Sequence, residues 1–350
     1  MYVYQRPVAG NENRYSKRQH QAHSRICHRL PTKSILLVLV VLTGLTIILQ
    51  DHSLIETNRE TDIVKRYENS SDPVLKRQAL RMKTLQQACA SLNLKITEYM
   101  PHKVCALTFL DTERKFIYCY IRKVASSSIK KALVNSTENG VSDERQMHIN
   151  NHNFLRKFGL KAKCLKFDRR VNRHISEYFK FIVVRHPLKR LLSAYRDKFL
   201  GEHPDNINVY QKGIGTKIIR KYRSNPSNES LTFGNDVTFE EFLRYVIDTR
   251  RSPNGHWQTF WDSCHPCENS FNFIAHLETL DDDMYYILQT ISNRPVPIPQ
   301  NSRNLVALGK TDELFKESYR KIPQSIMDSI KEQFHNDFLV FGYDPDIYKK

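Results

Sequence analysis

Residues 115–128 read Lys-Phe-Ile-Tyr-Cys-Tyr-Ile-Arg-Lys-Val-Ala-Ser-Ser-Ser, and this stretch decides the fold. Its first half, 115–121, is a short apolar and aromatic run typical of a buried strand. A polar loop follows over 122–128, and 129–133 reads as the start of a helix. This order predicts a phosphate site, because loop N–H groups and the positive end of a helix dipole converge on the anion. The loop lacks the GxxxxGK[ST] pattern of a Walker loop.

A second unit repeats this order of elements. Residues 178–184 form another buried-strand run, Arg185-His186-Pro187 turns the chain, and Pro187 suits the first position of a helix. The apolar face of that helix has the spacing i, i+3, i+4, i+7 and i+11, from Leu188 to Phe199. Strands that alternate with helices predict an α/β fold with a mainly parallel central sheet flanked by helices.

Later segments predict helices. A capping box from Thr238 to Glu241 opens a helix over 239–247, and Thr279 caps another. Residues 325–337 place four apolar side chains on one stripe and predict a third helix. Residues 200–236 have the Gly, Pro and Asn content of a long insertion.

The N-terminus predicts a membrane anchor. Residues 34–49 carry no charge and are close to the length that a single span needs. Seven basic residues and one acidic residue precede this run, a net charge of +6, and residues 51–68 carry three basic and five acidic residues. The positive-inside rule then places the N-terminus in the cytosol. We expect a cytosolic tail (1–33), a signal anchor (34–50), a lumenal stem (51–110) and a catalytic domain (111–350).

Sequons and cysteines agree with a lumenal body. The predicted glycosylation sites are Asn69, Asn135 and Asn228, each in an Asn-x-Ser/Thr triplet. Six of the seven cysteines follow the anchor, an even number that suits disulfides in an oxidising compartment, although spacing alone does not select their pairing. Cys264-His-Pro-Cys267 has no second CxxC, so a structural role is the simpler interpretation than zinc or redox chemistry.

Charge restricts the partners. The whole chain carries +17, which leaves +11 once the +6 of the tail is removed. A basic lumenal body favours anionic glycans or nucleotide-type cosubstrates over nucleic acid. Composition is that of a globular protein, with 40% hydrophobic and 26% charged residues.

The two units together resemble the Golgi carbohydrate sulfotransferases. Lys123–Lys131 resembles their 5′-phosphosulfate loop, and residues 185–199 resemble their 3′-phosphate motif, R-x-P-x-x-R-L-x-S-A-Y-R-x-K-F. Later landmarks are His256-Trp-Gln258, Cys264-x-Pro-Cys267, Phe273-Ile274 with Glu278-Thr279, and Asp337-Phe-x-x-Phe-Gly-Tyr343. The resemblance covers residues 115–345 and is closest to the branch of the chondroitin and dermatan 4-O-sulfotransferases.

The resemblance implies sulfuryl transfer from 3′-phosphoadenosine-5′-phosphosulfate (PAPS) to a sugar hydroxyl. It implies a P-loop-like sulfotransferase fold, a single-pass type II protein of the Golgi membrane, and no metal. The acceptor would be a glycan or proteoglycan, and an anionic chain is favoured. The resemblance leaves open whether the enzyme forms a homo-oligomer. The implied cosubstrate-binding residues are Lys123, Val124, Ala125, Ser126, Ser127, Ser128, Ile129, Arg185 and Ser193.

The acceptor hydroxyl needs a general base, and a histidine with a near-neutral pKa suits that task. His148 is our first candidate and His152 our second, because both lie between the two binding units. His256 is another candidate, with a packing or acceptor-contact role as the simpler interpretation.

The chain departs from the family pattern. Its 5′ loop has Arg122 where the family has Pro, and 126–129 read Ser-Ser-Ser-Ile where the family has Cys-Thr-Asn-Trp. His186 stands where an acidic residue is common. These departures put the acceptor, more than the reaction, in question.

Two other classes share part of the pattern. A lumenal glycosyltransferase would need an Asp-x-Asp-like metal motif, and the acidic run Asp281–Asp283 has a simpler explanation in the dipole of a helix that begins there. A glycan-binding protein without activity would not need Lys123, Arg185 and Ser193. Which sugar and which hydroxyl accept sulfate does not follow from the sequence.

Overall fold

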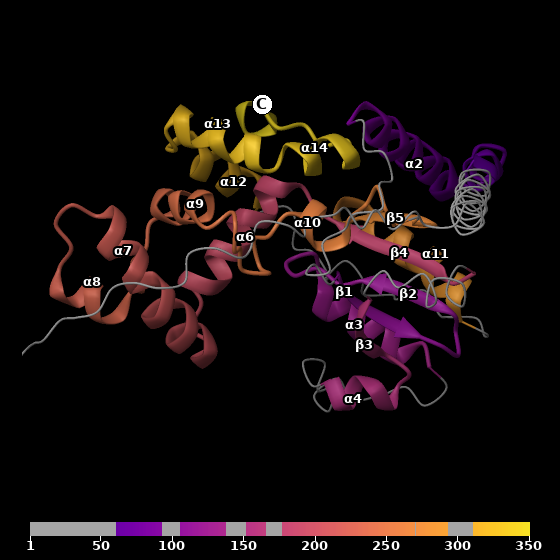
Figure 1. The fold of residues 1–350 in the computed structure, drawn as a ribbon, viewed down its shortest axis with the longest axis horizontal. Helices are drawn as coiled ribbons and strands as arrows, with labels where there is room; N and C mark the ends of the chain where they lie inside the picture. Colours follow the sequence, from indigo (N-terminus) through magenta and orange to yellow (C-terminus); the bar gives the residue numbers. More distant parts are fainter. Residues whose placement is uncertain (1–60, 93–105, 138–151, 166–176, 270, 293–310) are drawn as a thin grey trace, which may run out of the picture. The chain divides into compact units, whose positions relative to one another are not determined.

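The computed structural model describes residues 61–92, 106–137, 152–165, 177–269, 271–292 and 311–350 (Figure 1). All of them belong to one unit that begins at Glu56. The predicted anchor over 34–50 lies outside the described residues. Among the residues that are described, no helix is both long and apolar enough to cross a membrane.

Five strands form one sheet in the order β3-β1-β2-β4-β5 (Figure 1). They are β1 (Ala106–Asp111), β2 (Phe116–Cys119), β3 (Lys161–Leu165), β4 (Phe179–Val184) and β5 (Phe273–His276). Strand β4 is parallel to both of its neighbours, β2 and β5. Cys119 lies opposite Ile182 in the first pair, and Val184 lies opposite His276 in the second.

The sheet is mixed rather than mainly parallel, so the prediction of a mainly parallel sheet is corrected for the half that contains β1 and β3. Strand β1 is antiparallel to both β2 and β3. Asp111 and Phe116 face each other across the tight β1–β2 turn, and a hairpin of that length permits only antiparallel pairing. The Asp111 carboxylate accepts the backbone N–H groups of Glu113 and Arg114 at 3.0 and 2.9 Å, which fixes the turn.

Both predicted strand–loop–helix units are present. Strand β2 leads through residues 120–125 into α3 (Ser126–Asn135), and β4 leads through Arg185 and His186 into α6 (Pro187–Phe199). Because β2 and β4 are parallel neighbours, their carboxyl ends and the loops that follow lie at the same edge of the sheet. This arrangement positions the candidate site.

The remaining helices surround the sheet or form a second layer with α6. They are α2 (Pro73–Ser91), α4 (His152–Lys157), α7 (Thr216–Tyr222), α8 (Asn228–Phe233), α9 (Phe239–Asp248), α10 (Phe260–Cys264), α11 (Leu280–Ile291), α12 (Thr311–Arg320), α13 (Gln324–Gln333) and α14 (His335–Phe341). A π-helix, η2 (Asn206–Gly215), opens the predicted insertion. The helix predicted over 325–337 is divided at Phe334 into α13 and α14.

Buried apolar side chains form two main clusters. One fills the space around the sheet and includes Phe181, Ile129 and Phe273. The other lies among α6, α9, α12 and α13, with Trp257 fully buried within it. Helix α6 contributes its predicted apolar face to this second cluster, so it leaves the sheet edge and enters the helical layer.

Helix α2 belongs to the body rather than to a separate stem, and the boundary predicted at 110 falls within β1. The buried Gln78 amide donates to the Ile274 carbonyl at 2.9 Å and accepts the Ile274 N–H at 2.9 Å. Strand β5 is the last strand of the sheet, so its outer edge would otherwise carry unpaired backbone groups. Gln78 supplies those hydrogen bonds in the way that a further strand would.

A buried ion pair fixes α2 to the first turn of α11. Arg81 donates to Asp283 at 2.8 Å, to Thr279 Oγ1 at 2.7 Å and to the Ile274 carbonyl at 3.0 Å. Asp283 has a fully buried side chain and also accepts the His276 N–H at 3.0 Å. Thr279 is the N-cap residue of α11, but its hydroxyl donates to Asp283 instead of capping the helix.

Within the part of the chain that the structure describes, two disulfides connect these layers. Cys89 at the end of α2 pairs with Cys267, and Cys119 at the end of β2 pairs with Cys264. The two cysteines of the CxxC segment therefore bind different partners, which confirms its structural role. Cys105 lies outside the described residues, as does the side chain of Cys164.

His186 is the N-cap residue of α6, at the position where the resemblance leads us to expect an acidic residue. Its Nδ1 accepts the Leu188 N–H at 3.3 Å, so the imidazole caps the helix as a carboxylate would. Its Nε2 donates to the Asp344 carbonyl at 2.8 Å, which requires the neutral ring with the proton on Nε2. Burial lowers the pKa of His186 to about 4.

The Arg81–Asp283 pair predicts unequal effects of two neighbouring substitutions. Asp283→Ala leaves the Arg81 charge buried without its partner and should lower the free energy of unfolding by about 3–5 kcal/mol. Asp282→Ala removes an exposed partner of Arg77 and should cost less than about 1 kcal/mol. Urea unfolding followed by tryptophan fluorescence measures both. Equal losses would contradict the role assigned to the buried pair.

The His186 cap predicts a pH dependence of stability. Below pH ~6.5 the unfolded chain protonates His186, while the folded chain does not until about pH 4. The contribution of His186 to the free energy of unfolding is therefore fully present above pH ~6.5 and is lost as the pH falls toward 4. Between pH 7.5 and 5.5 this loss is about 1.4 kcal/mol. The variant His186→Asn keeps an acceptor for the helix cap but cannot titrate. Its free energy of unfolding should therefore fall by about 1.4 kcal/mol less than that of the parent between pH 7.5 and 5.5. Parallel pH profiles for the two proteins would refute this assignment.

Candidate active site

The two predicted binding loops meet at the carboxyl ends of β2 and β4. The guanidinium of Arg185 donates from Nη1 to the Lys123 carbonyl at 3.4 Å. Both side chains are half-buried, and burial lowers the pKa of each. The sheet therefore brings together two cations that lie 62 positions apart in the sequence.

The backbone of the first loop is shaped for close contact with a ligand. Lys123 and Ala125 have positive φ angles of 71° and 57°, which residues other than glycine adopt at a cost in free energy. Ala125 is the N-cap of α3 and has no side chain that could cap it. The N–H groups of the first turn, Ser126–Ser128, are thus left for another acceptor, and an anion is the acceptor that suits this position.

The loop's other predicted residues have different surroundings. Ser126 is buried, Ser127 is exposed and Ser128 is half-buried. Val124 and Ile129 are buried in the sheet core, with 0% and 1% of their surface exposed. The Ile129 N–H donates to the Ala125 carbonyl at 3.0 Å at the start of α3, and the predicted contact of Ile129 with a cosubstrate stays a prediction.

Lys123 belongs to a chain of charges along α6. Its ammonium lies 3.0 Å from an oxygen of Asp197, and Lys198 lies 3.1 Å from the same oxygen. Lys198 also donates to Asn206 Oδ1 at 3.0 Å. Burial lowers the pKa of Lys123, and the Asp197 carboxylate opposes that effect. One carboxylate between two ammonium groups leaves a net positive charge at the site.

A second arginine, Arg190, holds the loops together. It is 1% exposed and donates from Nε to the Arg122 carbonyl at 2.9 Å. Its Nη1 donates to the Gln258 carbonyl at 2.6 Å, and its Nη2 to the Gly255 carbonyl at 3.5 Å. Arg190 thus ties the residue before Lys123 to the turn that contains His256.

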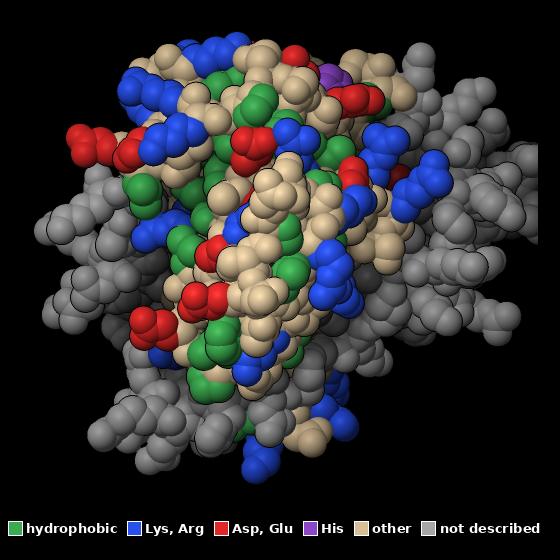
Figure 2. Space-filling view, turned by 90° about the vertical axis from the view of Figure 1, so that its left-hand side faces the viewer, with side chains coloured by type: hydrophobic (Ala, Val, Ile, Leu, Met, Phe, Trp, Pro, Cys, Tyr) green, Lys and Arg blue, Asp and Glu red, His purple; other side chains and the backbone are tan. Residues whose placement is uncertain are grey.

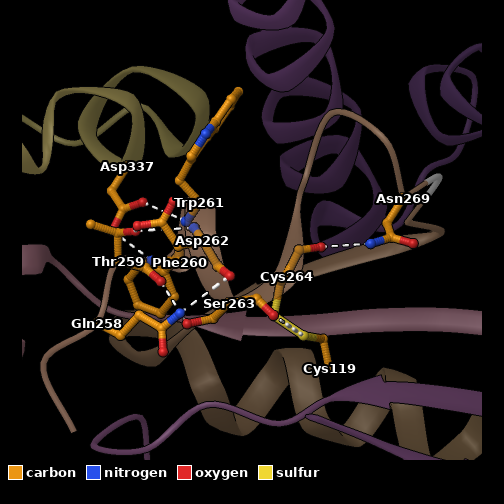
Figure 3. The surroundings of a disulfide bond; sticks show 10 residues. All are labelled: Cys119, Gln258, Thr259, Phe260, Trp261, Asp262, Ser263, Cys264, Asn269 and Asp337. Carbon is orange, nitrogen blue, oxygen red and sulfur yellow. Dashed lines mark hydrogen bonds between the residues drawn. A yellow bond between two sulfur atoms is a disulfide. The ribbon is translucent and has the colours of Figure 1, made fainter. Parts of the chain in front are cut away.

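The segment after that turn is fixed at its two ends by Asp337 and by a disulfide (Figure 3). The buried Asp337 carboxylate accepts the N–H groups of Phe260 and Trp261, each at 2.8 Å, and so caps α10. Cys264 at the other end of α10 is bonded to Cys119 at the end of β2. These contacts hold the 254–264 segment against the first loop.

The second loop is lined by a carboxylate and a phenol. The Glu278 carboxylate accepts a hydrogen bond from the Tyr343 hydroxyl at 3.1 Å. Its negative charge raises the pKa of Arg185 and so opposes the effect of burial. Ser193, the predicted partner of Arg185, is half-buried on α6. Its side chain has no hydrogen bond to any residue that the structure describes, and its contact with a ligand stays a prediction.

The predicted histidines are placed differently. His148 lies outside the described residues, and His152 begins α4 but its side chain is outside them too. Both stay predictions. His256 lies near the charge chain, within electrostatic range of Lys123, Lys198 and Arg122. The sequence patterns do not assign Arg190 and Asp197 to the site, although both residues lie within the 185–199 motif, seven positions apart.

The acidic run Asp281–Asp283 has a structural role. Asp283 is buried against Arg81, and Asp282 pairs with Arg77 at 3.0 Å. Two of its three carboxylates are thus paired with arginines of α2, which agrees with a structural explanation of this run. Over the described ranges, no group of three or more His, Cys, Asp or Glu side chains could hold a metal ion.

Comparison with known proteins agrees with this geometry. The model of a sulfotransferase family matches residues 107–344. Carbohydrate sulfotransferase 11 of Mus musculus is 34% identical over 247 residues, 69% of this chain and 68% of its own length. Carbohydrate sulfotransferase 14 of Danio rerio is 32% identical over 281 residues, 76% and 71% of the two chains. Carbohydrate sulfotransferase 10 of Gallus gallus is 30% identical over 250 residues, 67% and 66%.

No solved structure matches the chain. The family match includes all five strands except the first residue of β1, together with both loops of the site. The chain therefore belongs to the carbohydrate sulfotransferase family and is a sulfotransferase enzyme that acts on glycans.

Proposed function

We propose that the chain transfers a sulfuryl group from PAPS to a hydroxyl of a chondroitin- or dermatan-type glycan or of another chain that contains N-acetylgalactosamine. The meeting of the Lys123 and Arg185 loops at one sheet edge carries this proposal. The first loop brings Arg122 and Lys123 together with the N-terminal N–H groups of α3, and the second brings Arg185.

The donor's two phosphate groups would be divided between the loops. Lys123 and the Ser126–Ser128 turn hold the 5′-phosphosulfate, while Arg185 and Ser193 hold the 3′-phosphate. In-line transfer leaves negative charge on the departing phosphate oxygen, and Lys123 with the helix N–H groups stabilises that charge as it develops. The chemistry requires no metal.

The acceptor is proposed to be anionic. Lys123, Lys198 and Arg122 outnumber the single carboxylate of Asp197 among the charges around His256. Away from the site the charge is mixed: Figure 2 shows Lys and Arg interspersed with Asp and Glu over the α7–α8 end. Lys221 of α7 pairs with Asp248 of α9 at 2.6 Å, and Arg244 pairs with Glu240 within α9 at 2.8 Å. The excess of cations around His256 is what supports an anionic acceptor.

We also propose that the enzyme is a single-pass type II protein of the Golgi membrane with a lumenal catalytic domain. The charge difference across residues 34–50 supports this orientation. The two disulfides suit an oxidising lumen. Asn69, Asn135 and Asn228 are all exposed, as glycosylation of these sequons would require.

The donor assignment predicts the behaviour of three variants. Lys123→Ala and Arg185→Ala should each weaken binding of adenosine 3′,5′-bisphosphate, the desulfated product, by about tenfold or more, because each removes a charge-assisted hydrogen bond. Lys217→Ala, an exposed lysine of α7, is the matched control and should bind as the parent does. Calorimetry on the full chain in detergent gives the three affinities.

The same proteins then test turnover. Radiolabelled PAPS is offered with chondroitin, dermatan, desulfated heparin or a terminal N-acetylgalactosamine glycoside. Label in chondroitin or dermatan that both site variants lose would support the proposal, and label only in desulfated heparin would contradict the acceptor class. Failure of the parent protein to bind the bisphosphate would overturn the donor assignment.

A further inference from the structure

The ring of His256 is held in one orientation by Asn254. The Asn254 side-chain oxygen accepts the backbone N–H of His256 at 3.0 Å, and the same oxygen lies 2.8 Å from His256 Nδ1. An oxygen that accepts the first N–H has no proton to give to the ring. Nδ1 must therefore carry the proton and donate it to Asn254.

Tyr210 contacts the same nitrogen, Nδ1, and its hydroxyl oxygen is therefore a second acceptor for the proton on that nitrogen. Its hydroxyl lies 3.0 Å from Nδ1, and the two rings meet edge to face with centroids 5.4 Å apart. Trp257, fully buried, packs beside them at 6.4 Å from each ring. Rotation of the imidazole would break these contacts.

This arrangement leaves Nε2 as the unprotonated nitrogen. Nε2 makes no hydrogen bond to any residue that the structure describes, and it is not among the buried polar atoms that lack a partner. His256 itself is half-buried. Its lone pair is thus open to a ligand beside the Lys123 loop, while its other nitrogen is occupied. A base oriented by a third group is the arrangement that proton abstraction requires.

We propose that His256 is the general base that accepts the proton of the acceptor hydroxyl, and that Asn254 is the positioning residue that keeps Nε2 unprotonated. The inference rests on the proposed function. The hydroxyl oxygen attacks the donor sulfur and forms the new S–O bond as its proton passes to Nε2. The S–O bond to the 5′-phosphate breaks, and its electron pair stays on the departing phosphate oxygen.

Donor binding controls the strength of this base. In the free protein, burial and the charges of Lys198, Arg122 and Lys123 lower the pKa of His256 to about 3, and only Asp197 acts in the opposite direction. Tyr210 and Asn254 are its uncharged neighbours. A base with so low a pKa removes a hydroxyl proton poorly. A phosphosulfate bound at Lys123 adds negative charge beside these cations and raises the pKa of His256 toward neutrality.

A titration tests this control without any acceptor. The full chain, labelled with ¹³C at histidine Cε1, is titrated by NMR with and without saturating adenosine 3′,5′-bisphosphate. The signal that disappears in His256→Gln identifies His256. We expect its pKa to rise by at least one unit with the nucleotide, and by less in Lys123→Ala. A pKa unchanged by bound nucleotide would overturn the donor control.

Turnover tests the base itself. At saturating PAPS and with the acceptor that takes up label, His256→Gln should lower kcat by about 10²–10⁴-fold while bisphosphate affinity stays within about threefold. Asn254→Ala should lower kcat less and shift the acidic limb of the pH profile, whereas His335→Gln, an exposed histidine of α14, should change neither. The proposal would be overturned if the kcat of His256→Gln stayed within threefold of that of the parent and only His148→Asn lost the acidic limb of the pH profile. Loss of bisphosphate binding in the parent would instead reject the proposed function.

Discussion

The site depends on the hydrogen bonds that the guanidinium of Arg190 donates. It is buried, and it donates to carbonyls of Arg122, Gln258 and Gly255. A buried arginine without these acceptors would carry a large desolvation penalty, so the two loops can only approach each other in the arrangement that satisfies it. The position of Lys123, one residue beyond Arg122, follows from this. So does that of the His256 turn.

Two other buried contacts surround this one. Asp337 caps α10 through two N–H groups, and the Cys119–Cys264 disulfide joins the end of α10 to the end of β2. Each restrains a loop that would otherwise be free to move at the edge of a sheet. The site can therefore hold backbone in costly conformations, such as the positive φ angles of Lys123 and Ala125, because the surrounding packing fixes them. Preorganised N–H groups and cations of this kind stabilise developing charge without rearrangement.

The charge at the site is net positive, with the single carboxylate of Asp197 among three cations. Asp197 holds Lys123 and Lys198, and the three groups with Arg122 surround His256. An anionic donor changes this balance more than any other ligand would. On this view the basic residues bind the donor and also make the reactivity of a neighbouring histidine conditional on its presence.

Much of the fold could be predicted from the sequence. The strands at 116–119 and 179–184, the helix after Pro187 and the capping box at Thr238 were all found, because alternation, helical spacing and cap residues are local signals. The anchor and the glycosylation sites stay predictions. Strand β1 and the packing of α2 were missed, since Gln78 and Arg81 look like surface residues until Ile274 and Asp283 meet them. Spacing identified Lys123 and Arg185, but it could not show their contact.

The sequence by itself determined the two strand–loop–helix units and their cations, because hydrophobic period and turn residues act within a few positions along the chain. Only the tertiary structure decided that β2 and β4 are parallel neighbours, which disulfides form, and that Asn254, Tyr210 and Lys198 surround His256. These contacts join residues up to 178 positions apart. Their partners are selected by burial and by the cost of leaving buried polar groups without hydrogen bonds, which no local pattern encodes.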